Sequence, residues 1–133
     1  MLVFLLLFQI KNIYADILFT VEIHNVTVNG GMIYIGIYTN EKSFKEINPD
    51  RIIAVEPKST VLSQEIYLPV GEYVIGLLQD TNGNERMDYG LFNIPKEPYG
   101  WSNMKGKIPG NYNQLKFKIV TQNERIIIPL VKY

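Results

Sequence analysis

The chain has 133 residues, enough for one domain built around one hydrophobic core. Its 13 basic residues balance 13 acidic residues without forming a block, so a formal charge of +0 disfavours nucleic acid and anionic membrane surfaces as partners. Cysteine is absent, which excludes disulfides, thiolate metal sites and a lipid-modified amino-terminal cysteine.

The beginning of the chain, Met1 to Ala15, is predicted to be a signal peptide. Met1 to Phe8 is an unbroken apolar run, shorter than the roughly 20 residues of a membrane span but suited to the apolar core of a signal. Cleavage after Ala15 would leave a mature domain of residues 16–133, without a transmembrane span, in the periplasm or outside the cell. No Lys or Arg precedes the apolar run, so an amino-terminal core strand remains the alternative.

The first half of the mature domain begins with two predicted strands. Apolar and polar residues alternate from Ile17 to Ile23 and again from Met32 to Thr39, the period of half-buried strands. Asn29-Gly30-Gly31 between them tolerates positive φ and predicts a hairpin. Asn40 to Pro57 has no long period, so a helical turn around Ser43 to Ile47 or a loop is expected there.

The second half supplies four more strand patterns. Thr60 to Leu68 alternates, whereas Tyr73 to Leu78 is apolar on both faces and is therefore predicted to be a central strand. Leu115 to Ile119 and Arg125 to Val131 follow, and Pro129 marks the last of these as an edge strand because proline cannot donate to a ladder.

These patterns predict an all-β fold. Six to eight short strands without a long amphipathic helix favour a two-sheet antiparallel β-sandwich, immunoglobulin-like or prealbumin-like, in one domain. The central strand is followed by a long aperiodic segment, Asp80 to Gln114, which contains the sole tryptophan. Loops of this length are usually functional or disordered, and the aromatic residues here favour function.

The start of that loop has the spacing of a calcium-binding turn. Oxygen-bearing side chains occupy its first, third, fifth and ninth positions: Asp80, Asn82, Asn84 and Asp88. Calcium takes six to eight oxygens, and the carbonyl of Arg86 at the seventh position is a further candidate ligand. Leu91 stands where the familiar twelve-residue calcium loop has a bidentate Glu, so Glu97 or water would complete the shell. The alternative is that these side chains only cap turns.

Three motifs in fixed order carry a resemblance to a known family: Leu68-Pro69-Val70-Gly71-Glu72-Tyr73, then Asp80 to Asp88, then Ile94-Pro95-Lys96-Glu97-Pro98-Tyr99-Gly100-Trp101-Ser102-Asn103. Together they resemble the domain of unknown function 2141 family over essentially the whole mature chain. The resemblance implies an exported bacterial β-sandwich and brings no established activity. The chain departs at Glu85, where the family commonly has Gly, and at Trp101, where Phe is usual.

Three functions remain open. The first is a calcium-stabilised, non-catalytic binding or structural module in which Tyr99 and Trp101 face a protein or carbohydrate partner, or in which Trp101 plugs one end of the sandwich. The second is a metal-assisted hydrolase using Asp80, Asp88 and Glu97; the sole imidazole, His24, lies on a strand far from this loop in sequence. The third is a carrier of a small apolar ligand between the sheets.

Overall fold

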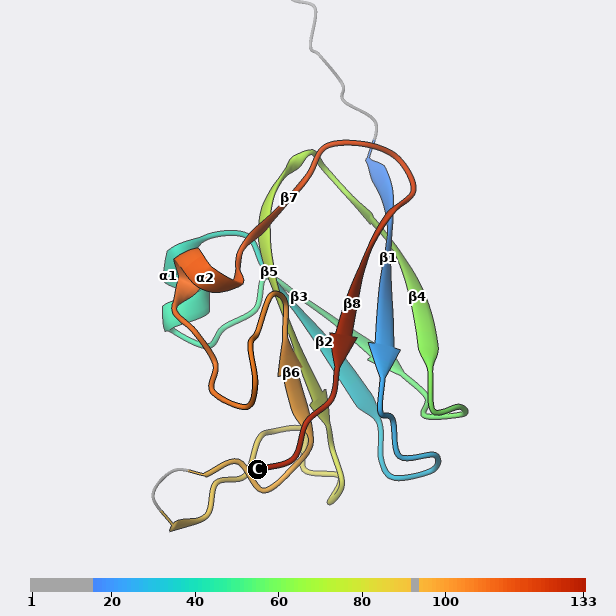
Figure 1. Cartoon of the computed structure of the whole chain (residues 1–133), viewed down its shortest axis with the longest axis vertical. Helices are drawn as coiled ribbons and strands as arrows, with labels where there is room; N and C mark the ends of the chain where they lie inside the picture. The colour runs from blue at the N-terminus through green and yellow to red at the C-terminus, as the bar shows by residue number, and fades with distance from the viewer. Residues whose placement is uncertain (1–15, 92–93) are drawn as a thin grey trace, which may run out of the picture.

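The computed structural model describes residues 16–91 and 94–133, which form eight strands and two short helices (Figure 1). In chain order these are β1 (Ile17–His24), β2 (Ile33–Tyr38), α1 (Glu41–Lys45), β3 (Arg51–Val55), β4 (Leu62–Leu68), β5 (Gly71–Gln79), β6 (Tyr99–Trp101), α2 (Tyr112–Leu115), β7 (Phe117–Ile119) and β8 (Glu124–Pro129). The predicted signal peptide, Met1 to Ala15, lies outside the described residues. Within them, neither helix has the length and apolar character needed to cross a membrane.

β1 is the middle strand of a three-stranded sheet with the order β4-β1-β8. Its alternating sequence buries every second side chain from Ile17 to Ile23, as the sequence predicted. β4 pairs antiparallel with β1, whereas β8 pairs parallel with it, from Phe19 opposite Glu124 onward. β8 is an edge strand of this sheet, so the prediction from Pro129 is confirmed.

β5 is the central strand of the second, five-stranded sheet. β3, β2, β5 and β6 are neighbours in that order, and β7 also pairs with β5. β7 uses the first part of β5, where Tyr73 is opposite Phe117, and β6 uses a later part, where Gly76 is opposite Trp101. Both partners share one edge of β5 because β2 occupies the other. The predicted central position of Tyr73 to Leu78 is confirmed.

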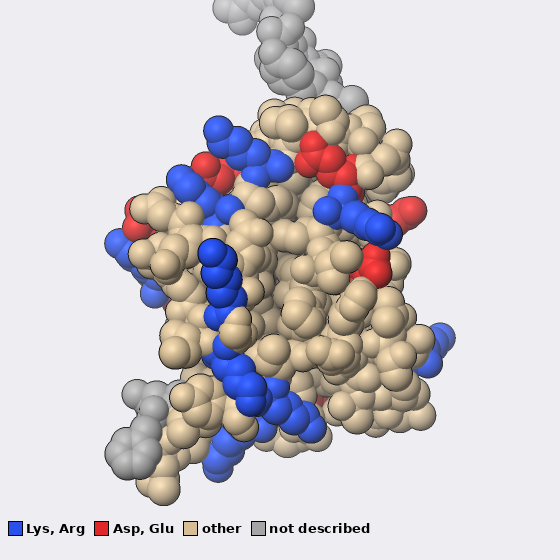
Figure 2. All heavy atoms as spheres, in the orientation of Figure 1, with Lys and Arg blue, Asp and Glu red and all other residues tan. Residues whose placement is uncertain are grey.

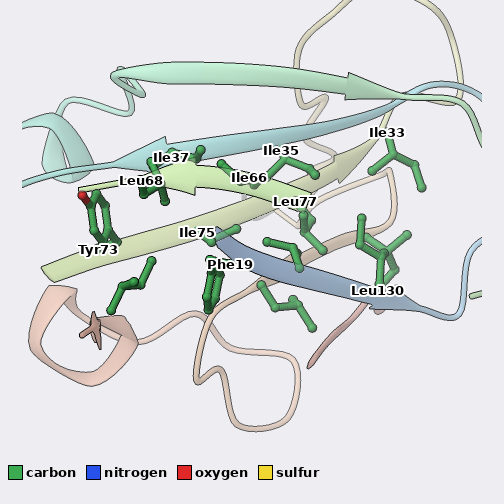
Figure 3. Packing of buried hydrophobic residues seen from close by; sticks show 14 of the residues in the cluster. Phe19, Ile33, Ile35, Ile37, Ile66, Leu68, Tyr73, Ile75, Leu77 and Leu130 are labelled. Atoms are coloured by element: carbon green, nitrogen blue, oxygen red, sulfur yellow. The ribbon is translucent and has the colours of Figure 1, made fainter. Parts of the chain in front are cut away.

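The main hydrophobic core fills the space between the two sheets (Figure 3). Phe19 of β1 stacks on Phe117 of β7, with ring centroids 5.4 Å apart. The fully buried members come from both sheets: Phe19, Val21, Ile23, Ile33, Ile35, Ile37, Ile66, Ile75, Ile119 and Ile128. The predicted all-β sandwich is therefore confirmed.

A smaller cluster covers the opposite, outer face of the five-stranded sheet. Tyr38 of β2 and Val74 of β5 pack there against Tyr112 and Leu115 of α2. Phe44 of α1 also joins this cluster, with its ring edge-on to Tyr38 at 5.9 Å. Tyr73 to Leu78 is apolar on both faces because one face meets the core and the other meets this cluster.

The predicted hairpin between the first two strands is wrong. β1 and β2 belong to different sheets, so the turn that contains Asn29 and Gly31 carries the chain from one sheet to the other. Both residues have positive φ, 56° and 109°, as expected of a tight turn. Each strand has one apolar face, and these faces pack against each other across the core instead of lying side by side.

Three further features differ from the sequence interpretation. β8 runs parallel to β1, and no short turn joins these strands to set their direction. β3 was not predicted because Ile52 and Ala54 are apolar although they are exposed, so the sequence of this edge strand shows no alternation. β6 was not predicted because its three residues are too few to show a period. The helical turn expected around Ser43 is present as α1, with Asn40 as its N-cap.

Candidate functional site

The loop that follows β5 is anchored at its start by the turn between β1 and β2. The Asp80 amide donates to the Met32 carbonyl at 2.8 Å, and a Cβ on Gly31 would lie 1.9 Å from the Asp80 carbonyl oxygen. Only glycine fits there. The buried Gln79 side chain bonds the same turn, because its amide nitrogen donates to the carbonyls of Thr27 and Gly31. The loop therefore begins from a fixed backbone position.

Asp80 organises the first bend of the loop. Its side chain is buried, and its two carboxylate oxygens accept from the amides of Gly83 at 3.0 Å and Glu85 at 2.8 Å. Gly83 and Glu85 both have positive φ, 74° and 61°. Glycine would suit position 85 better than the Glu of this chain, because L side chains are strained in this conformation.

Asp88 closes the bend by meeting the two asparagines. The Asn84 side-chain nitrogen donates to both carboxylate oxygens of Asp88, at 3.0 and 2.9 Å, and the Asn82 side-chain nitrogen donates to one of them. The hydrogen bond from Asn82 holds the pKa of Asp88 below its usual range, helped by Asn84, Arg86 and Lys96 and opposed by burial. Three of the predicted side chains thus converge on one point.

Asn82 and Asn84 also cap turns. The Asn82 side-chain oxygen accepts from the Asn84 amide at 3.2 Å, and the Asn84 side-chain oxygen accepts from the Arg86 amide at 3.1 Å. Asn82 and Asn84 therefore do both: their oxygens cap turns, and their nitrogens contact Asp88. Among residues 16–91 and 94–133, no three His, Cys, Asp or Glu side chains form a ready metal-binding group. The side chains that meet at Asp88 are therefore those of two asparagines, and not a cluster of carboxylates alone.

Glu97 lies beside this bend because the chain turns back on itself. The Lys96 amide donates to the Asp88 carbonyl at 2.8 Å, and the Gln79 amide donates to the Pro98 carbonyl at 2.9 Å. Glu97 stands between these two contacts and is only 2% exposed. One of its carboxylate oxygens accepts from the Thr81 hydroxyl at 3.4 Å, and the other is buried without a hydrogen-bond partner among the described residues.

Burial raises the pKa of Glu97, and the nearby carboxylates of Asp80 and Asp88 raise it further. The Asp88 amide and the Thr81 hydroxyl act in the opposite direction without cancelling the rise. A buried oxygen that lacks a partner and faces two further carboxylates is an unfavourable arrangement for the protein alone. A cation at this point would relieve it.

The two aromatic residues proposed to face a partner lie in different surroundings. Tyr99 is buried, and its hydroxyl donates to the Lys107 carbonyl. Trp101 is half-buried on the outer face of the five-stranded sheet, where its ring packs near Tyr38 and Phe44 with centroids 5.6 and 5.4 Å away. The ring also covers Gly76 in the middle of β5, so Trp101 lies along the sheet and not over an end of the sandwich.

The same outer face carries a cavity of about 930 Å³. Its floor is formed by Tyr34 and Tyr38 of β2 and by Gly76 and Leu78 of β5. Its walls come from α1 and the following loop, from Glu85 to Tyr89, from Ile94 and Pro95, and from Lys107 to Pro109. This outer groove was missed in the sequence. One signal was available in the sequence. The outward-facing positions of β2 and β5 hold aromatic, aliphatic or glycine residues, whereas a solvent-exposed face usually carries charged residues.

The fold and the loop define a class of protein: a two-sheet β-sandwich whose central strand, β5, is followed by a turn rich in carboxylate and amide side chains. The chain belongs to the family described as uncharacterized protein conserved in bacteria (DUF2141), which it matches over residues 21–127. The suspected family resemblance is thereby confirmed. The chain matches no curated protein and no solved structure.

Proposed function

We propose that this protein is an exported, non-catalytic binding or structural module of the bacterial envelope, stabilised by calcium held in the loop after β5. The observation that carries the proposal is the buried carboxylate oxygen of Glu97, which has no hydrogen-bond partner among the described residues and lies near Asp80 and Asp88. Export rests on the apolar segment Met1 to Phe8 and is a prediction from sequence.

The ligands that would hold the ion come from both arms of the loop. Asp80, Asn82, Asn84, the Arg86 carbonyl and Asp88 belong to the outgoing arm, and Glu97 belongs to the returning arm. Carboxylate and amide oxygens in a flexible arrangement suit calcium, whereas magnesium demands near-ideal octahedral geometry and keeps more water. For an ion to bind, the two asparagine side chains would turn their oxygens toward Asp88 in place of their nitrogens.

Binding of calcium would remove the repulsion between these carboxylates and order the loop after β5. Without an ion, the carboxylates of Asp80 and Asp88 disfavour the charged form of the buried Glu97. With calcium present, the same carboxylates would link the two arms of the loop and fix residues 85–89, which line the outer groove. The ion would therefore serve stability and shape, without a chemical step.

The proposal is tested by thermal unfolding in about 10 mM calcium and in chelator. For a loop of few charges we expect a dissociation constant of the order of 0.1 mM, so about one hundred-fold excess should add about 2.7 kcal/mol to the free energy of unfolding. An Asp88→Asn variant should lose most of this gain. A midpoint that is the same with calcium and with chelator in the parent protein contradicts the proposal.

The matched control is Glu85→Gln, which removes one negative charge from the same loop at an exposed side chain that is not a proposed ligand. It should retain the calcium-dependent gain of the parent protein. Equal losses in Asp88→Asn and Glu85→Gln would mean that calcium only screens the charge of the loop. Magnesium at the same concentration should give a smaller gain than calcium.

A further inference from the structure

The outer groove is an unpartnered apolar surface at the centre of the five-stranded sheet. Across four strands, one row of residues faces it: Ile52, Gly36, Gly76 and Trp101. Several large apolar side chains that line the groove are exposed: Ile47, Ile52, Tyr89, Ile108 and Tyr133. Isolated exposed apolar residues are ordinary, but a contiguous group around a concave surface marks a binding site.

The groove extends along the strands and also across four of them. Its floor runs from Tyr34, next to the calcium loop, to Tyr38, next to α1. Four residue steps along a strand cover about 13 Å. The volume of about 930 Å³ lies near the top of the range for small-molecule sites. A groove of this length has room for an extended apolar chain laid along the strands.

The charges around the groove have one predominant sign. Among the described residues, three cationic side chains line it, Lys45, Arg86 and Lys107, and one side-chain carboxylate, that of Glu85. Lys45 pairs with Glu41 at 3.0 Å, but neither Arg86 nor Lys107 forms an ion pair with any described residue. Figure 2 shows Lys and Arg side chains as a band over the part of the molecule where β6 and the loop below it lie. The groove therefore favours an anionic group at its edge.

From this combination we propose that the outer groove binds a free amphiphile with a linear apolar chain and a carboxylate head. The chain lies along the floor between Tyr34 and Tyr38 and contacts the Trp101 ring. The carboxylate lies at the edge formed by Arg86 and Lys107, because guanidinium and ammonium groups form charge-assisted hydrogen bonds with carboxylates. The lining is mainly apolar, which favours the hydrocarbon chain of an amphiphile over the hydroxyl-rich rings of a sugar.

The site depends on the proposed calcium function for one wall only. Glu85, Arg86, Met87 and Tyr89 belong to the calcium loop or follow it directly, whereas the floor belongs to β2 and β5. Calcium should therefore tighten binding by fixing Arg86, and its removal should weaken binding without abolishing it.

The chain supplies its own probe, because Trp101 is its one tryptophan. We would titrate the protein with 10-bromodecanoate, whose bromine quenches tryptophan fluorescence on contact, with decyltrimethylammonium and a maltohexaose as competitors. We expect saturable quenching that decanoate without bromine reverses. Neither the cationic amphiphile nor the sugar should reverse it. Absence of saturable quenching, or reversal by the cation or the sugar as effective as that by decanoate, overturns the proposal.

Charge variants test the edge of the groove. Arg86→Glu combined with Lys107→Glu should weaken binding about tenfold or more, since each lost ionic contact is replaced by repulsion. Lys58→Glu combined with Lys118→Glu makes the same change in net charge at exposed positions outside the groove and should leave binding unchanged. Equal weakening by the two double variants would contradict a specific site.

The calcium and groove proposals can fail separately. If quenching is saturable but neither it nor the unfolding midpoint responds to chelator, the groove proposal stands and the calcium proposal falls. If chelator lowers the unfolding midpoint while quenching is absent in both conditions, the calcium proposal stands and the groove proposal falls.

Discussion

Two single residues in this protein, Glu97 and Gly76, have surroundings that make specific demands on their side chains. Glu97 is buried, lies near two other carboxylates, and has one carboxylate oxygen without a hydrogen-bond partner in the described part of the chain. Gly76 is a different case, because its missing side chain makes room for the Trp101 ring. Both residues can be tested by a change of a few atoms.

Glu97→Gln should have opposite effects in chelator and in calcium. In the folded protein the pKa of Glu97 is raised above its ordinary value of 4.5, so the fold holds this proton more tightly than the unfolded chain does. The stability from protonation is complete below the ordinary pKa and is lost as pH rises through the raised pKa. In chelator at about pH 7.5, Gln should therefore stabilise the fold, and its advantage should shrink toward about pH 4.5.

The same variant should show a smaller calcium-dependent gain, because Gln supplies a neutral oxygen in place of a carboxylate. Urea unfolding at both pH values, with calcium and with chelator, measures all four conditions. A Glu97→Gln protein less stable than the parent in chelator at about pH 7.5 would show that the carboxylate is well accommodated without an ion.

Gly76→Ala should destabilise the protein by about 1–3 kcal/mol, the usual cost of overpacking. The new Cβ would lie 2.7 Å from the Trp101 ring, which is itself packed against other aromatics. Gly36, directly opposite on β2, is the matched control, since its nearest contact would be Pro49 at 3.4 Å. Urea unfolding of the two variants compares them, and an equal loss in both would place the cost in the strand backbone and not at the ring.

At the level of elements, strands with a clear hydrophobic pattern were predicted from the sequence, and strands without such a pattern were missed. β1, β2, β4, β5 and β8 show apolar alternation or continuous apolar runs, and their positions were correct within a few residues. β6 has three residues and is fixed by β5 on one side, with the amide of Tyr99 also bonded to the carbonyl of Val131. Such a strand exists only through tertiary contacts, which no local pattern records.

The candidate metal centre was predictable in part for the same reason. The spacing of Asp80, Asn82, Asn84 and Asp88 is local, and three of their side chains do converge. The burial of Glu97 depends on the return of the chain to Gln79, and its missing partner follows from that burial. The outer groove combines residues of four strands, a helix and three loops, so its shape could not be read from the sequence.

Ser102→Ala should loosen the junction between β5, β6 and α2. The Ser102 hydroxyl is buried, donates to the Leu115 carbonyl at 2.6 Å and accepts from the Ile75 amide at 3.1 Å. Its removal would leave both backbone groups without that partner, at a cost of about 1–3 kcal/mol. Urea unfolding measures the loss; Ser63→Ala on the exposed face of β4 is the control and should change stability little. Equal stability of the two variants would contradict a structural role for Ser102.

On the scale of the whole molecule, a rigid two-sheet core carries a long loop whose order depends on local polar contacts. The core between the sheets is apolar and independent of the candidate metal ligands. The loop contains exposed residues from Thr81 to Arg86 and has little apolar packing there. Stability is therefore expected to be uneven, with the loop opening more readily than the strands.

Limited proteolysis should reveal this difference. Trypsin should cut after Arg86 faster in chelator than in calcium, because an ion would hold the adjoining backbone closed. Mass spectrometry of the early fragments identifies the site. Cleavage after the exposed Lys58, between β3 and β4, is the internal control and should not respond to calcium. Equal calcium protection at both sites would point to an effect on trypsin itself or on global unfolding.

The parallel pairing of β1 with β8 has a consequence for how the protein reaches its folded state. Phe19 is opposite Glu124, so the ladder joins positions from the two extremes of the described chain. Such contacts of high sequence separation form late and slow the folding reaction. Until the last strand arrives, one side of β1 presents unpaired amides and carbonyls, a template onto which a strand of another molecule can add. Completion of the chain thus also protects it against aggregation.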